Sequence, residues 1–248
     1  MTSRDSTPFL PLGDDGDLAN RGWRSGRDWA TLLAFAPIQA PWLLRSLRGG
    51  SKAAKRALLD RLELPHDALP NLGSWKADTG LLALVADHIL REKPKLVVEF
   101  GTGASTLIVA RALQLVGGGT FISFDQHAQF VEATRSWLAE HGLEADLRAV
   151  PLKPAPDGWP GLWYDHGPLP DDIDLMLIDG PPWTLHPFTR GAAATLFGQI
   201  AAGGTILLDD AARPGERIVA RRWRKAWPEF DFRLVHSGTK GTLVGKRR

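Results

Sequence analysis

Over most of the chain, segments with helix-like hydrophobic spacing alternate with short runs that are apolar throughout. Apolar residues recur on one side of 77–92 and of 104–115, whereas KLVVEF (95–100), TFISFD (120–125) and IDLMLID (173–179) are almost continuously apolar. A strand that is apolar on both faces is typical of a parallel sheet with helices on both sides. The pattern therefore predicts a doubly wound α/β domain.

The end of the chain breaks this alternation. The runs at 232–237 and 242–247 are joined by only GTKG, which leaves no room for a crossover helix, so they must pair as an antiparallel hairpin. We expect a Rossmann-like, mostly parallel seven-stranded sheet with this C-terminal hairpin. The remaining elements are expected at 127–141, 147–152, 188–201 and 205–210.

The N-terminal quarter has a different character. Residues 1–26 are rich in Asp, Gly, Ser and Arg and have no apolar period, which predicts a flexible arm. Two helical stretches at 28–48 and 51–63, separated by a Gly-Gly pair, form a helical extension over 27–70. A turn-rich segment then leads to the main domain, 71–248.

The segment 29–44, WATLLAFAPIQAPWLL, is the longest apolar stretch. Either it lies on a membrane surface, or it caps the domain or forms a homodimer contact. No run reaches the ~18 apolar residues that a membrane span needs, and no secretory signal is present, so we expect a cytoplasmic protein.

The chain has no cysteine and a net charge of +2. Its basic residues are spread out, which argues against a nucleic-acid partner; the basic run 221–225 is either the solvated side of a helix or an anion site.

The segment VVEFGTGAST carries the first chemical signal. A strand leads into a glycine turn that lets a ligand approach the backbone, and the next helix offers free N–H groups to a carboxylate. Glu99 at the strand end is placed to meet an amino group, and S-adenosylmethionine carries both an amino group and a carboxylate. The predicted cofactor-binding residues are Glu99, Gly101, Thr102, Gly103, Ser105, Asp125, Gln126, Pro151, Leu152 and Asp179.

Asp125, at the end of the next strand, can accept hydrogen bonds from both ribose hydroxyls, or it caps the following helix. A dinucleotide-binding GxGxxG motif would have glycine where this chain has Thr106, which disfavours an NAD-type oxidoreductase. That oxidoreductase and a non-catalytic binding protein with the same fold remain the alternatives. Val150, Pro151 and Leu152 follow the third strand, where they either contact adenine or pack in the core.

With these motifs in place, EFGTGASTLIVARAL resembles the bacterial methyltransferase 24 family of class I S-adenosylmethionine-dependent methyltransferases. WYD at 163–165, IDGPP at 178–182 and LLDDAAR at 207–213 extend the resemblance, which covers about 75–248; FDQH at 124–127 departs from it. The resemblance implies the fold, the cofactor and a methyltransferase activity. We expect O-methylation of a small molecule or a glycan hydroxyl.

Three carboxylates, Asp179, Asp209 and Asp210, follow two neighbouring strands. This resembles metal-dependent catechol-type O-methyltransferases, and oxygen ligands suit Mg²⁺ or another hard divalent cation. The alternative is that these residues cap turns and helices without a metal. The predicted catalytic residues are Asp179, His186 and Asp209, with His186 as a candidate general base.

Two further sets of residues lie near the expected acceptor. Arg190 and Arg213 either bind an anionic acceptor or form structural ion pairs. The segment 154–169, with several aromatic residues, is too long for a simple connector, and we expect it to form a lid or an acceptor wall.

Overall fold

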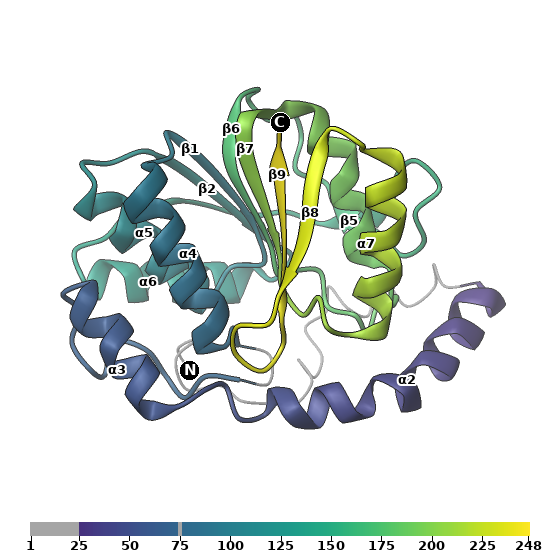
Figure 1. Ribbon diagram of the computed structural model, residues 1–248, viewed down its shortest axis with the longest axis horizontal. Helices are drawn as coiled ribbons and strands as arrows, with labels where there is room; N and C mark the ends of the chain where they lie inside the picture. The colour runs from purple at the N-terminus through teal and green to yellow at the C-terminus, as the bar shows by residue number, and fades with distance from the viewer. Residues whose placement is uncertain (1–24, 74–75) are drawn as a thin grey trace.

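The computed structural model describes residues 25–73 and 76–248 (Figure 1). Within them, seven strands form one sheet in the order β3-β2-β1-β6-β7-β9-β8, in which only the β7–β9 and β9–β8 pairs are antiparallel. The predicted Rossmann-like fold is confirmed. The strands of this sheet are β1 Leu96–Phe100, β2 Thr120–Asp125, β3 Asp146–Ala149, β6 Ile173–Ile178, β7 Ile200–Leu208, β8 Phe230–Val235 and β9 Thr242–Arg247.

Helices cover both faces of the sheet. In Figure 1 the helices α4, α5 and α6 lie to the left of the strands and α7 lies to the right. Each face has its own apolar core, and strand residues alternate between the two: Val97 faces the first core and Val98 the second. The helices are α2 Gly26–Ser46, α3 Lys52–Arg61, α4 Thr79–Glu92, α5 Ala104–Leu115, α6 Ala128–Glu140, the 3₁₀ helix η2 Thr189–Gln199 and α7 Pro214–Ala226.

The expected strand at 147–152 is wrong in one respect, because two separate strands take its place. β3 ends at Ala149, and the chain then enters β4 (Leu152–Pro154), which pairs antiparallel with β5 (Leu162–Tyr164) in a two-stranded ladder. The irregular segment predicted after Pro154 therefore contains a strand. Leu162, Trp163 and Tyr164 are all buried, so this small ladder covers part of the second core.

The two helices of the N-terminal extension sit differently. Ser51 caps α3 through its hydroxyl, which accepts the Ala54 N–H at 3.0 Å. The leucines of α3 enter the first core, whereas α2 packs against α7 and exposes much of its apolar surface. The flexible arm predicted for residues 1–26 lies almost wholly outside the described residues. None of the helices in 25–73 and 76–248 is long and apolar enough to cross a membrane.

Candidate functional site

The carboxyl ends of three neighbouring strands are joined by backbone hydrogen bonds. The Gly101 N–H donates to the Phe124 carbonyl at 2.8 Å, and the N–H groups of Asp179 and Gly180 both donate to the Phe100 carbonyl, at 2.8 and 2.7 Å. These bonds hold the turns after β1, β2 and β6 against one another. Ligands of open α/β sheets bind at this edge, outside the carboxyl ends of the strands.

Glu99, the last residue but one of β1, is fully buried beneath the glycine turn. Its Oε2 accepts hydrogen bonds from the hydroxyls of Thr106 and Ser123, each at 2.6 Å. The Thr106 hydroxyl also accepts the Gly103 N–H at 2.8 Å, so this side chain links the turn to the carboxylate. Burial raises the pKa of Glu99 to about 7, although nearby hydroxyls oppose the rise. Its Oε1 has no hydrogen-bond partner among the described residues.

The two glycines of the turn have different roles. Gly101 has φ +103°, and a Cβ built there would lie 2.7 Å from the Gly180 backbone nitrogen, so the fold itself requires glycine. A Cβ on Gly103 would meet only the Phe130 ring, at an ordinary 3.9 Å. The protein therefore leaves room above Gly103, which opens α5 and its free N–H groups.

Asp125 ends β2 beside this turn. Its two carboxylate oxygens accept the backbone N–H groups of Thr102 at 3.2 Å and of His127 at 2.9 Å. Burial raises the pKa of Asp125 to about 6, with hydrogen bonds and charge from His127 among the opposing influences. The N-cap of α6 is His127, so Asp125 does not cap that helix in the way the sequence allowed. Gln126, also predicted at the cofactor site, is half-buried beside it.

Pro151 and Leu152, the residues predicted to contact adenine, differ in burial. Leu152 is 7% exposed and belongs to the second core, whereas Pro151 is exposed and its carbonyl accepts the Asp165 N–H at 2.9 Å. The β4–β5 ladder places the Tyr164 ring 5.5 Å from that of Phe100. The Tyr164 hydroxyl lies directly over Gly180, where a Cβ would stand 2.1 Å away. Sequence reasoning gave no role to Tyr164 at the turn after β6.

The three predicted metal ligands do meet. One oxygen from each of Asp179, Asp209 and Asp210 lies within 4.8 Å of the others. Asp209 and Asp210 are buried, while Asp179 is half-buried at the strand edge. The sequence thus predicted the cluster correctly.

Three basic side chains, all buried, contact the same carboxylates. Asp210 pairs with Arg190 at 3.0 Å and with Arg213 at 2.9 Å. Lys240, from the turn between β8 and β9, lies 3.5 Å from Asp209 and 3.6 Å from Asp210, and Arg190 also reaches Asp179 at 3.5 Å. Arg190 and Arg213 are therefore structural partners of these carboxylates. Lys240 was missed, because a turn residue far along the chain carries no local sign of this contact.

These contacts shift the pKa values of Asp209 and Asp210 in opposite directions. Burial alone would raise the pKa of Asp210. The positive charges of Arg213, Lys240 and Arg190 outweigh burial and hold this pKa well below its usual range. Burial and the Asp210 charge raise the pKa of Asp209.

Three buried basic side chains lie within ion-pair distance of these carboxylates, although Asp209 Oδ1, Asp209 Oδ2 and Asp210 Oδ1 have no hydrogen-bond partner among the described residues. A divalent cation would add positive charge to a buried cluster in which three bases already balance three carboxylates. The residues therefore do not fit the predicted Mg²⁺ site.

His186 lies in the loop after the Gly180-Pro181 turn, with 3% of its surface exposed. Its Nδ1 accepts the Phe188 N–H at 3.1 Å, which places the imidazole proton on Nε2. That nitrogen lies 3.8 Å from Oδ1 of Asp28, on α2. Because the Nδ1 lone pair is already used, these contacts favour a structural role for His186 over the predicted general base.

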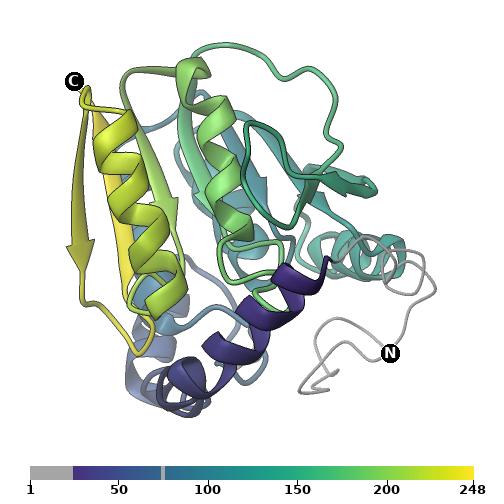
Figure 2. The same cartoon turned by 90° about the vertical axis from the view of Figure 1, so that its right-hand side faces the viewer.

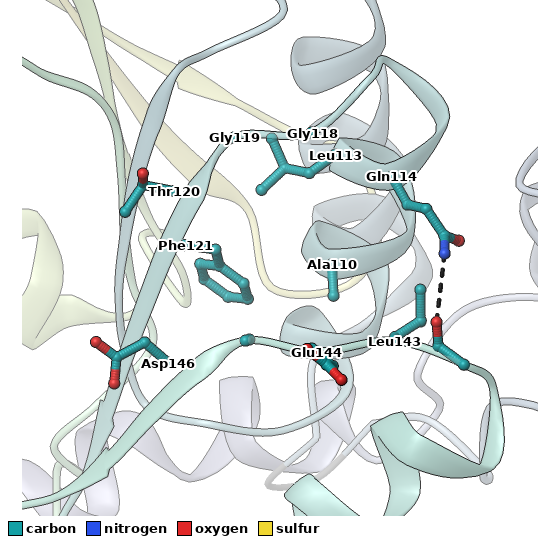
Figure 3. A pocket seen from close by; sticks show the side chains of 12 residues that line it. Ala110, Leu113, Gln114, Gly118, Gly119, Thr120, Phe121, Leu143, Glu144 and Asp146 are labelled. Carbon is teal, nitrogen blue, oxygen red and sulfur yellow. Dashed lines mark hydrogen bonds between the residues drawn. The ribbon is translucent and has the colours of Figure 1, made fainter.

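A surface hollow lies between α5, the start of β2 and the loop before β3, away from these groups (Figure 3). Thr120 and Asp146, which line it, begin their strands, so it opens at the amino ends of the sheet. In Figure 3 a hydrogen bond from Gln114 to the Gly142 carbonyl, 3.3 Å long, crosses its rim. Since this edge is opposite the glycine turn, the hollow is not part of the candidate site.

Comparison with known proteins agrees with this geometry. Residues 98–211, from within β1 to just beyond Asp210, match the family model described as a methyltransferase domain, of the methyltransferase 24 group. The matched segment contains the glycine turn, Asp125 and the carboxylate cluster. No curated protein sequence matches the chain.

Solved structures share the fold at low sequence identity. A methyltransferase from Geobacter sulfurreducens has a TM-score of 0.53 and 18% identity, over 96% of this chain and 99% of its own. An O-methyltransferase from Bacillus cereus, in complex with SAH, has a TM-score of 0.54 and 13% identity, over 88% and 100%. A Streptomyces achromogenes O-methyltransferase of tomaymycin synthesis, in complex with SAM, has a TM-score of 0.52 and 14% identity, over 79% and 88%.

Proposed function

We propose that this chain, which has the class I methyltransferase fold and matches the methyltransferase-domain family over residues 98–211, transfers the methyl group of S-adenosylmethionine to a hydroxyl of a small molecule or glycan. The observation that carries the proposal is the buried Glu99 carboxylate beneath a glycine turn that opens a helix. A cationic amino group and a carboxylate, one on each side of that turn, match these two features.

The cofactor would be held by groups already in place. The free N–H groups at the start of α5, around Ser105, face the methionine carboxylate, and Glu99 Oε1 is available to the amino group through the space beside Gly103. The remaining lone pairs of Asp125 can accept the ribose hydroxyls, because backbone N–H groups fix the orientation of this carboxylate.

The acceptor would be activated by Asp179, the one member of the carboxylate cluster that is not fully buried. In the transfer, the acceptor oxygen forms a bond to the methyl carbon while the carbon–sulfur bond breaks, which leaves neutral S-adenosylhomocysteine. The acceptor proton passes to the Asp179 carboxylate. Asp209 and Asp210 keep Arg190 and Lys240 in place behind it, and so act as positioning residues.

Calorimetry with S-adenosylhomocysteine and with NAD tests the cofactor, and transfer of labelled methyl to an extract tests turnover.

Gly103→Val should abolish measurable binding of S-adenosylhomocysteine, with an affinity loss of 100-fold or more, while the protein still folds. A Cβ at this position meets only the Phe130 ring, at 3.9 Å, and the valine side chain would fill the space through which the ligand reaches the backbone. Gly198→Val, at an open position in η2, is the matched control and should bind normally. Calorimetry and circular dichroism give both readings; a folded Gly103→Val protein with unchanged affinity would remove the cofactor from this turn.

Affinity for S-adenosylhomocysteine should rise between pH 6 and pH 8. Because burial raises the pKa of Glu99 to about 7, the carboxyl is largely protonated at pH 6 and ionised at pH 8, and only the ionised form pairs with the amino group. Binding therefore releases protons in this range, which calorimetry in buffers of different ionisation enthalpy detects. Glu99→Gln should weaken binding and flatten the pH dependence between pH 6 and pH 8. A profile that stays as steep in this variant assigns the titration to another group.

A further inference from the structure

Helix α2 exposes several large apolar side chains to solvent. Large side chains along its length are open to solvent, and between them lie the exposed Ala30, Ala34, Pro37 and Pro41. Exposed apolar patches of this kind mark contact surfaces in folded proteins. The exposed fractions are 68% for Leu33, 65% for Leu44, 51% for Ile38, 45% for Trp29 and 43% for Leu47.

The charges of α2 are arranged around this face. Arg27 lies near its beginning, and Arg45 and Arg48 lie at its end; all three are exposed. The single acidic residue of the helix, Asp28, binds the Ser25 cap at 2.8 Å and faces His186 at 3.8 Å. The exposed side of α2 is therefore apolar along its middle and cationic at both ends. Long basic side chains at such ends reach the lipid headgroups while the apolar face enters the boundary layer.

Helix α7, which packs against α2, adds more positive charge. Figure 2 shows both helices on the side of the molecule that faces the viewer. Glu216, the acidic residue of α7, is buried, so the exposed side of α7 carries only positive charge. The exposed basic residues of α7 are Arg217, Arg221, Arg222, Arg224 and Lys225.

We propose that α2 and the basic side of α7 together form a docking surface for an anionic lipid membrane, with the apolar face of α2 at the headgroup boundary. A two-fold contact with a second copy would bring the same patches together and place arginine against arginine. A nucleic acid would pair with the basic side of α7 but would leave Leu33, Ile38 and Leu44 in water. A negatively charged lipid surface satisfies both the apolar and the basic residues.

The test is sedimentation of the full chain with vesicles of phosphatidylcholine alone and of phosphatidylcholine with phosphatidylglycerol. We expect binding to the anionic vesicles, weakened by added salt, and little binding to the neutral ones. Arg217→Gln with Arg221→Gln should lower the partition coefficient about tenfold or more, since each basic residue near an anionic surface contributes about fivefold. Leu33→Ser with Leu44→Ser should reduce binding at every salt concentration.

Lys93→Gln with Lys95→Gln removes the same charge at the turn between α4 and β1 and should bind as the unchanged protein does. Binding of S-adenosylhomocysteine by each variant checks that it is folded. The proposal is overturned if neither vesicle type binds the protein, or if the α7 variant and this control bind equally. A dimer in solution that Leu33→Ser with Leu44→Ser dissociates, without vesicle binding, would assign the face to a second copy instead.

Discussion

We expect Asp179→Asn to lower kcat by about 10²- to 10⁴-fold, the usual contribution of a general base, and to leave the affinity for S-adenosylhomocysteine within about threefold. Asparagine keeps the size of the side chain and its place beside Arg190, 3.5 Å away, but cannot take the acceptor proton. Labelled methyl transfer at saturating cofactor gives kcat, and calorimetry gives the affinity. Asp171→Asn, an exposed carboxylate ahead of β6, is the matched control and should retain full activity.

Labelled methyl transfer in the presence of a chelator distinguishes a carboxylate base from a metal site. Because Arg190, Arg213 and Lys240 already contact the carboxylates, we expect the unchanged enzyme to keep its activity in excess chelator. Loss of activity in chelator, restored by Mg²⁺, would show that the basic side chains give way to a cation. Full activity of the Asp179→Asn protein would instead move the base elsewhere.

The strands and the cofactor turn could be predicted because their signals are local. An apolar run such as IDLMLID needs burial on both faces wherever it occurs. Gly101 sits in a turn that requires a positive φ, here +103°, which glycine adopts readily. Glu99 and Asp125 follow from the same reasoning, since each stands at or near the end of a strand whose position was already known. Thr106 was used only to exclude a dinucleotide motif, although its hydroxyl connects Gly103 to Glu99.

The partners of the carboxylate cluster could not be predicted, because they come from distant parts of the chain. Lys240 reaches Asp209 from a hairpin turn, and nothing in the letters GTKG distinguishes a buried lysine from a solvated one. The sequence therefore showed three carboxylates without their counter-charges, and a cation was the natural candidate to balance them. The β4–β5 ladder was missed for a related reason: strands this short pair only because the second core gives Leu162 and Tyr164 a surface to cover.

Arg190→Met should lower the free energy of unfolding by about 3–5 kcal/mol, the cost of leaving a buried charge without its partner. The guanidinium is buried and contacts Asp210 at 3.0 Å, Asp179 at 3.5 Å and the Pro181 carbonyl at 3.2 Å, so methionine fills the space but satisfies none of these groups. Urea unfolding followed by circular dichroism measures the change. Arg148→Met, at an exposed pair with Asp146, is the matched control and should change the free energy by less than about 1 kcal/mol.

The pH dependence of this loss gives a second reading that a simple packing defect would not produce. Although Asp210 is buried, the three bases hold its pKa in the folded protein below its pKa in the unfolded chain. The stability that this pairing contributes is therefore present above the unfolded pKa and is lost as the pH falls through the folded pKa. The difference between Arg190→Met and the unchanged protein should therefore be largest near pH 7 and shrink below pH 4. A difference that stays constant from pH 7 to the acid limit would show that Arg190 stabilises the protein through its packing, and would remove the charge balance on which the metal-free cluster depends.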